Sequence, residues 1–129
     1  MNSGLIIRDA HIPGRAPIDA YGNGGFRFAD MSHRGSILCL PSGIHGWEPA
    51  DPAALREDDF AAVVDQAAEV DILLVGTGTE MRPLPGALRA RLREAGIFVD
   101  PMSTGSAVRT YTVLLAEDRL VAAALSAVD

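Results

Sequence analysis

The chain has 129 residues, of which 48% are hydrophobic, and its net charge is −6, so we expect one domain that buries a real core. All eleven basic residues are arginines scattered along the chain, which argues against a nucleic-acid surface. The absence of lysine excludes Schiff-base chemistry and the lysine of a phosphate-binding P-loop.

The first third of the chain is predicted to be rich in antiparallel strands. Its strongest signal is Gly22-Asn23-Gly24-Gly25, because asparagine and glycine tolerate the positive φ of tight hairpin turns. Two prolines and a glycine between His11 and Pro17 predict a loop. The expected segments are an extended amino-terminal segment and loop at 1–17 with a short edge strand at 5–9, strands at 18–21, 26–28 and 35–40, and a polar turn at 31–34.

A loop and a helix are predicted next. The loop spans 42–52 and carries Trp47, which is either an exposed anchor for a partner or a side chain packed over the sheet. The helix spans about 57–69, with apolar residues at helical spacing and three acidic residues in its first turn. Negative charge is favoured there by the helix dipole.

The stretch from 70 to 111 is the organising unit of the predicted fold. The run from Val70 to Val75 is almost unbroken in its apolar character, which is typical of a strand buried on both faces. Strand and helix then alternate as a βαβα unit. The further expected elements are a helix at 84–95 that Gly96 ends, a strand at 97–99, a helix from 103 to about 115 and a final strand at 119–125.

Together these elements predict one α/β domain over residues 1–129 with three layers. The central sheet is expected to hold five or six strands. It is expected to be mixed, because an antiparallel, strand-rich first third precedes the βαβα unit.

The loop Gly76-Thr77-Gly78 follows the central strand, where open α/β sheets place ligands. It is a weak dinucleotide motif, because Met81 stands where a third glycine would fall. Two interpretations remain open. The loop is either a tight turn that leads the chain out of the sheet or a place where bare backbone approaches a small ligand.

A second candidate lies at the next strand end, where Ser103 and Thr104 begin a helix. They either cap the helix or, with its free amide groups, hold a small anion. Arg109 lies one turn into the helix and would supply the counter-charge. The alternative, which we favour, is that backbone carbonyls or Glu117 saturate its guanidinium. Parallel neighbouring strands would bring both candidate loops to one edge of the sheet.

The sequence shows no pair of a nucleophile and a base at motif spacing, no metal-binding pattern and no cofactor motif. The lone Cys39 is expected to be a small buried hydrophobic residue. Leu5 to Ile7 is too short for a signal peptide and no run is long enough to span a membrane, so we expect a cytoplasmic protein without membrane insertion. We interpret Trp47 and the turn with His33 and Arg34 as the candidate contact region for a protein partner.

Several segments occur together in a familiar order. They are 18–22 with 25–28, 35–38, Trp47, 73–78, and Thr104, Ala107, Arg109-Thr110-Tyr111, Leu114, Glu117 and Arg119. This ordered set resembles the small domain family of unknown function that includes mitochondrial complex I assembly factor 3 and the adipogenesis-associated Mth-type domain protein. Where the family usually has asparagine after Arg-Thr-Tyr, this chain has Thr112.

The resemblance implies a three-layer α/β domain with a mixed sheet and brings no established reaction. It favours a non-catalytic protein of bacterial origin that acts through protein partners, in assembly or maintenance of a respiratory or membrane complex. The alternative is an enzyme or binding protein for a small anion at the strand ends. A homodimer is a further expectation, because the first-third strands can leave an open sheet edge.

Overall fold

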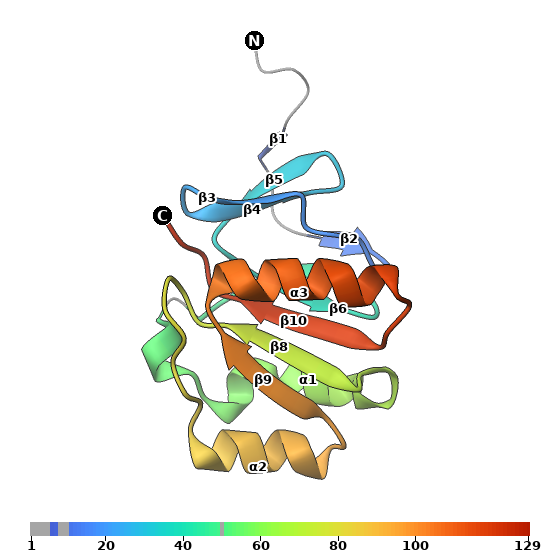
Figure 1. Ribbon diagram of the computed structural model, residues 1–129, viewed down its shortest axis with the longest axis vertical. Coiled ribbons are helices and arrows are strands. Elements are labelled where there is room, and N and C mark those ends of the chain that lie inside the picture. Colours follow the sequence, from blue (N-terminus) through green and yellow to red (C-terminus); the bar gives the residue numbers. More distant parts are fainter. Residues whose placement is uncertain (1–5, 8–10, 50) are drawn as a thin grey trace.

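Two β-sheets organise the chain, which a computed structural model describes over residues 6, 7, 11–49 and 51–129 (Figure 1). The large sheet has six strands in the order β2, β7, β6, β10, β8, β9, and the small sheet has four in the order β1, β5, β4, β3. The bounds are β1 Ile6–Ile7, β2 His11–Pro13, β3 Ala20–Gly22, β4 Gly25–Phe28, β5 Met31–Arg34, β6 Ser36–Leu40, β7 Gly43–Trp47, β8 Ile72–Gly76, β9 Phe98–Met102 and β10 Val121–Leu125.

The large sheet is mixed, as the sequence predicts. Strands β9, β8 and β10 run parallel, whereas β10, β6, β7 and β2 pair antiparallel in succession. Strand β8 lies between β9 and β10, so the chain leaves it for one neighbour and later returns to the other. Two crossovers of the usual right hand in opposite directions place their helices on opposite faces of the sheet.

Two helices, α2 and α3, are longer than the other helical segments. Helix α2 spans Gly86–Glu94, and α3 spans Thr104–Ala116. The segment predicted as one helix at 57–69 is instead divided, because Gln66 has the non-helical angles φ −109° and ψ 18°. It comprises the 3₁₀ turn η2 (Glu57–Phe60), the short helix α1 (Ala61–Asp65) and the 3₁₀ turn η3 (Ala67–Glu69), after the 3₁₀ turn η1 (Pro52–Ala54).

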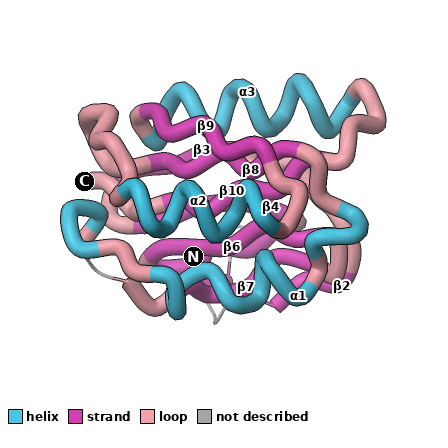
Figure 2. The backbone as a smooth tube through the Cα atoms, turned by 90° about the horizontal axis from the view of Figure 1, so that it is seen from below, coloured by secondary structure: helices cyan, strands magenta, loops and turns pink. Residues whose placement is uncertain are grey.

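The core lies on both faces of the large sheet, which makes the three layers. In β6, Leu38 and Leu40 pack toward α1 and α2, while Ile37 and Cys39 pack toward α3 and the small sheet. This period of two is what a strand with two buried faces requires. Figure 2 shows α1 and α2 in front of the strands, and in Figure 1 α2 lies below the large sheet while α3 and the small sheet lie above it.

The predicted hairpin in the first third is confirmed. Strands β3 and β4 pair with Gly22 opposite Gly25, and the turn between them holds Asn23 at φ 53° and Gly24 at φ 80°. These are the left-handed angles that the sequence signal required. The first-third strands pair antiparallel apart from β1, which runs parallel to β5.

Three segments differ from the sequence prediction. Residues 31–34, expected as a turn, form β5, because the turn lies earlier, at Ala29 (φ 48°) and Asp30 (φ 60°). The stretch 11–13, expected as a loop, is the edge strand β2, where Pro13 is tolerated as the last residue. Part of the predicted loop at 42–52 is β7, which pairs with β6 and β2.

Strand β7 was not predicted, because glycine weakens the sequence signal of a strand. Glycine is nevertheless required at position 43, the first residue of β7. Gly43 has φ 147° and faces β2 so closely that a Cβ atom would collide with the Ile12 carbonyl. Within the described residues, no helix combines the length and the apolar character needed to cross a bilayer.

Candidate functional site

The two candidate loops lie side by side, as the sequence predicts for parallel neighbours. Strands β8 and β9 pair in register, with Gly76 opposite Met102. The backbone N–H of Thr77 donates to the Met102 carbonyl at 2.9 Å, and the Thr104 N–H donates to the Gly78 carbonyl at 2.8 Å. The strand ends are therefore joined directly by the backbone.

Most polar atoms between the two loops are engaged with one another. The Thr104 hydroxyl accepts from the Gly78 N–H at 3.0 Å and donates to the Ser126 carbonyl at 2.8 Å. The Thr77 hydroxyl accepts from the Arg82 N–H at 2.9 Å and donates to the Glu80 carbonyl at 2.7 Å. Both threonines are fully buried. These bonds make the junction a packed seam with two inward-facing hydroxyl groups.

A hollow of about 230 Å³ borders one side of this seam. Thr77 and Gly78 line it together with Thr79, Glu80 and Arg82 and with the carboxyl-terminal residues 127–129. The hollow thus offers one guanidinium, two carboxylates and a threonine hydroxyl. Ser103, Thr104 and Arg109, the other members of the predicted ligand site, do not line it.

The helix α3 begins as a capped helix beside this seam. The Ser103 hydroxyl accepts from the Ser106 N–H at 3.3 Å, which is the expected capping bond. Arg109 is exposed and its guanidinium donates to the Ser106 hydroxyl at 3.4 Å. In the described part of the chain, neither a backbone carbonyl nor Glu117 bonds to this guanidinium, so the favoured prediction that they saturate it is wrong.

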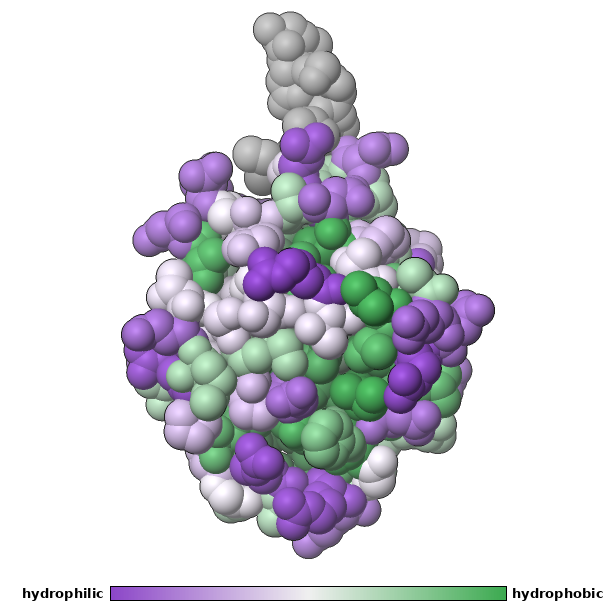
Figure 3. Space-filling view, viewed as in Figure 1, coloured by the Kyte–Doolittle hydropathy of each residue, from purple (hydrophilic) through white to green (hydrophobic). Residues whose placement is uncertain are grey.

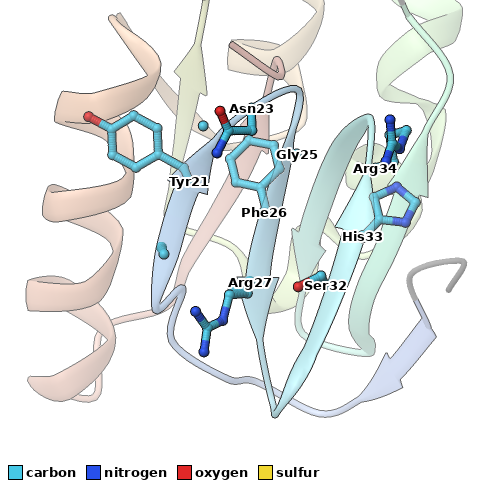
Figure 4. Close-up of a pocket in the computed structure, with 10 residues that line it drawn as sticks. Tyr21, Asn23, Gly25, Phe26, Arg27, Ser32, His33 and Arg34 are labelled. Carbon is cyan, nitrogen blue, oxygen red and sulfur yellow. The ribbon is translucent and has the colours of Figure 1, made fainter. Parts of the chain in front are cut away.

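Tyr21 covers the first turn of α3, a contact that the sequence did not indicate. A Cβ atom at Gly105 would collide with the Tyr21 hydroxyl, and it would lie 3.6 Å from Nη1 of Arg109. Glycine therefore lets the phenol ring lie directly on the helix backbone. Figure 4 shows Tyr21 pointing from β3 toward this helix.

Trp47 is packed rather than exposed, with 8% of its surface accessible. Its indole Nε1–H donates to the Asp59 carbonyl at 2.9 Å, and its ring meets Phe60 edge to face at 5.4 Å. The alternative in which the loop packs over the sheet is therefore the one observed. The side chain ties β7 to η2.

The structure nevertheless brings the three predicted contact residues together. His33, Arg34 and Trp47 line one hollow of about 310 Å³, with Glu48 at its rim. The His33 ring occupies space left by two glycines, since a Cβ atom at Gly46 would lie 3.5 Å from its Cε1. Strands β5 and β7 thus meet here although their residues are separated in sequence.

A second hollow, of about 330 Å³, lies on the small sheet and shares His33 and Arg34 with the first (Figure 4). Arg27 and Tyr21 lie on the side toward α3, and His33 and Arg34 lie on the opposite side (Figure 4). Ser32 stands opposite Arg27 across the β4–β5 pair. Sequence reasoning missed Arg27 and Ser32, because their proximity depends on a strand that it read as a turn.

The charge on this surface is not compensated locally. Neither the Arg27 nor the Arg34 guanidinium forms a hydrogen bond or an ion pair with any residue in the described ranges. The whole chain has a net charge of −6. The hollow on the small sheet is therefore a locally basic feature of an acidic protein.

A hydrophobic area occupies another face, where β9 is the edge of the large sheet (Figure 3). Large apolar side chains on and near this edge are exposed to solvent. The accessible fraction of the residue surface is 65% for Phe98 on β9, 56% for Val113 on α3 and 38% for Leu120 before β10. Contiguous apolar exposure of this kind is typical of a protein contact surface.

Cys39 and Tyr111 form a buried pair beneath α3. Burial raises the pKa of the Cys39 thiol to about 12, and a hydrogen bond with Tyr111 lowers it in part. Burial, together with the neighbouring thiol, also raises the pKa of the Tyr111 hydroxyl. Both groups are therefore neutral at physiological pH, and the thiol has no reactive character. Across the described residues, no cluster of three or more His, Cys, Asp or Glu side chains is placed to hold a metal ion.

Comparisons with known proteins agree with this architecture. A family model described as "Protein of unknown function (DUF498/DUF598)" matches residues 18–126. An uncharacterized protein of Rhodobacter capsulatus is 42% identical over 94% of this chain and 92% of its own length. The mouse "NADH dehydrogenase [ubiquinone] 1 alpha subcomplex assembly factor 3" is 27% identical over 94% of this chain, which spans 65% of that protein.

A solved structure supports the fold directly. The crystal structure of an outer membrane protein from Bartonella henselae is 59% identical, with a TM-score of 0.90, over 92% of this chain and 100% of that one. The three-layer arrangement with a mixed sheet is therefore confirmed.

Proposed function

The chain belongs to the family of proteins of unknown function DUF498/DUF598, and we propose that it works by binding a protein partner. The proposal is supported by the similarity of the chain to proteins named as assembly factors. The proposed role is assembly or maintenance of a respiratory or membrane complex. The observation that carries it is that the relationship to the assembly factors extends over 94% of this chain.

The proposed contact surface consists of the two adjoining hollows that share His33 and Arg34. We name it the arginine surface and define it by Arg27, Ser32, His33 and Arg34. No acidic residue lines the hollow on the small sheet, and neither guanidinium forms an ion pair in the described ranges, although Glu48 lines the adjoining hollow. An acidic segment of the partner is therefore the matching chemistry. Arginine is well suited to this role, because its planar fork binds carboxylates at two points.

The test is quantitative affinity isolation from the source organism with the full chain as bait. Wild type should recover one partner in reproducible, stoichiometric amount, and recovery should fall as salt is raised. A variant with Arg27→Glu and Arg34→Glu should lose that partner at least tenfold. The matched control, Arg91→Glu with Arg93→Glu on the exposed face of α2, changes the charge equally and should retain it.

Recovery of no stoichiometric partner would refute the proposed function. Equal loss with both double variants would refute only the location of the contact. Deletion of the gene supplies an independent measurement, because membranes should then contain less of the assembled respiratory complex on native gels.

A second candidate function is the binding of a small anion beside Thr77 and Gly78. The observation in its favour is that Arg82 lines the hollow at the end of β8, where open α/β sheets place ligands. Thermal-shift measurements with phosphate and with small carboxylates test it, since a ligand of the folded state raises the melting temperature with concentration. Arg82→Ala should abolish the shift, whereas Arg109→Ala, outside the hollow, should not. An unchanged melting temperature at millimolar anion would exclude this function.

Self-association is proposed across the β9 edge, with a second copy as the occupant. The exposed ring of Phe98 and its apolar neighbours supply the contact area. Sedimentation should show a dimer at micromolar concentration that Phe98→Glu dissociates, and a wild-type monomer would refute the proposal.

A further inference from the structure

Three polar side chains meet at the turn between β6 and β7, outside the surfaces described above. Ser42 lies in that turn, His45 follows on β7, and Gln66 lies at the carboxyl end of α1. The Ser42 hydroxyl oxygen is 3.1 Å from Nε2 of His45 and 2.8 Å from Nε2 of Gln66. The Ser42 N–H lies 3.0 Å from Oε1 of Gln66.

The directions of these hydrogen bonds follow from their donors. The backbone N–H of Ser42 can only donate, so the amide atom of Gln66 that faces it is the oxygen. The Gln66 nitrogen therefore faces the Ser42 hydroxyl and donates to it. The hydroxyl keeps its own proton for an acceptor, and Nε2 of His45 is that acceptor in the tautomer that carries its proton on Nδ1.

This arrangement suits an activated serine. A serine hydroxyl becomes nucleophilic when a neighbouring base removes its proton, and the distance of 3.1 Å to His45 is within the range at which this transfer occurs. The Gln66 donor stabilises the negative charge that develops on the serine oxygen as the proton leaves. Its second bond, to the Ser42 backbone, fixes the position of the serine.

A hollow of about 570 Å³ opens beside these side chains, and Ser42, His45 and Gln66 all line it. Apolar atoms of Leu38, Leu40, Trp47, Ala61 and Ala62 form part of its wall, and Glu48, Asp58 and Asp59 also contribute to the lining. Apolar walls favour an apolar acyl chain. The three carboxylates disfavour anionic substrates by repulsion.

We propose that Ser42 is the nucleophile of an acyl-transfer site, with His45 as its general base and Gln66 as a positioning residue, for neutral esters of apolar acyl groups. This inference goes beyond the proposed function and does not depend on it. In the first step the Ser42 oxygen bonds to the acyl carbon while its proton moves to Nε2 of His45. The ester C–O bond breaks, and the departing alcohol takes that proton. Water then attacks the acyl-serine, and the carboxylic acid is released.

The first experiment treats the full chain with a neutral alkyl fluorophosphonate, which bonds to an activated serine and releases fluoride. Intact-mass and peptide mass spectrometry should find one adduct, located on Ser42. Ser42→Ala should remove it. The control Ser106→Ala changes a serine on α3 outside the hollow and should label at the wild-type rate.

Two further variants separate catalysis from structure. His45→Gln can still accept the serine proton in a hydrogen bond but is not a base, so labelling should slow by about 100-fold or more. Gln66→Glu keeps the acceptor for the Ser42 N–H but loses the donor to the hydroxyl, so labelling should slow at least tenfold. Melting temperatures measured in parallel show whether each variant remains folded, and these two should stay within a few degrees of wild type.

The second experiment uses p-nitrophenyl butyrate, a neutral ester. Wild type should release at least one equivalent of nitrophenolate, and Ser42→Ala should release none above the rate in buffer. The proposal is overturned by any of three results: no adduct on Ser42, wild-type labelling of a folded His45→Gln variant, or no nitrophenolate release that depends on Ser42.

Discussion

The junction between the strand ends can be tested by replacing Thr104 with valine. Thr104 is fully buried, and its hydroxyl joins the Gly78 N–H to the Ser126 carbonyl. Valine has nearly the same shape but no hydroxyl, so the packing stays while both hydrogen bonds disappear. The change therefore isolates the polar part of the seam.

The expected cost follows from the two groups left without a partner. Each buried, unsatisfied backbone group costs about 1–3 kcal/mol, so Thr104→Val should lower the free energy of unfolding by about 3 kcal/mol. Small domains have about 5–15 kcal/mol in total, so this loss should be easy to measure. Urea unfolding followed by circular dichroism is the assay, with an unchanged m-value as the sign that the folded state is intact.

The matched control is Thr112→Val on the same helix. The Thr112 hydroxyl makes no side-chain hydrogen bond with a residue in the described ranges, and the side chain is half-buried. Its replacement should change the free energy of unfolding by no more than about 0.5 kcal/mol. If Thr104→Val costs less than about 1 kcal/mol, or no more than the control, the bridge does not hold the junction together.

Two further predictions concern the layer that contains α3. Burial keeps Cys39 and Tyr111 protonated in the folded protein, whereas the ordinary pKa is 9.0 for a cysteine thiol and 10.0 for a tyrosine hydroxyl. The contribution of these groups to the free energy of unfolding should therefore be complete below pH 9 and should fall as pH rises above it, by up to about 1.4 kcal/mol per pH unit for each group. Urea titrations of wild type and Cys39→Ala at alkaline pH measure this fall, which should be shallower in the variant. In a Tyr21→Ala background, Gly105→Ala should raise the free energy of unfolding by about 1 kcal/mol, the usual helix preference for alanine. With the Tyr21 hydroxyl in place the gain should be smaller, and equal gains in both backgrounds would show that the phenol does not press on the helix.

The sequence predicted the central part of the fold because local signals there agree with tertiary structure. The apolar run at β8, the glycine after α2 and the serine before α3 each mark an element without help from distant residues. The antiparallel part was harder to predict. Strand β7 is short and rich in glycine, and its identity depends on β2 and β6 lying on either side of it. The turn at Ala29 and Asp30 lacks the glycine or asparagine by which left-handed residues are usually recognised.

The sites were harder to predict than the fold for a related reason. Thr77, Thr104 and Arg109 could be predicted as candidates because they follow strand ends, where ligands usually bind, whereas no base and nucleophile stand at a known motif spacing in the sequence. The Ser42 and His45 pair is local in sequence, but what orients it is Gln66, which is 24 residues away from Ser42. That contact exists because the helix predicted at 57–69 ends early, at the residue whose side chain crosses to the β6–β7 turn. A break in a helix therefore has a specific consequence here, since it releases an amide side chain to fix the direction of a serine hydroxyl.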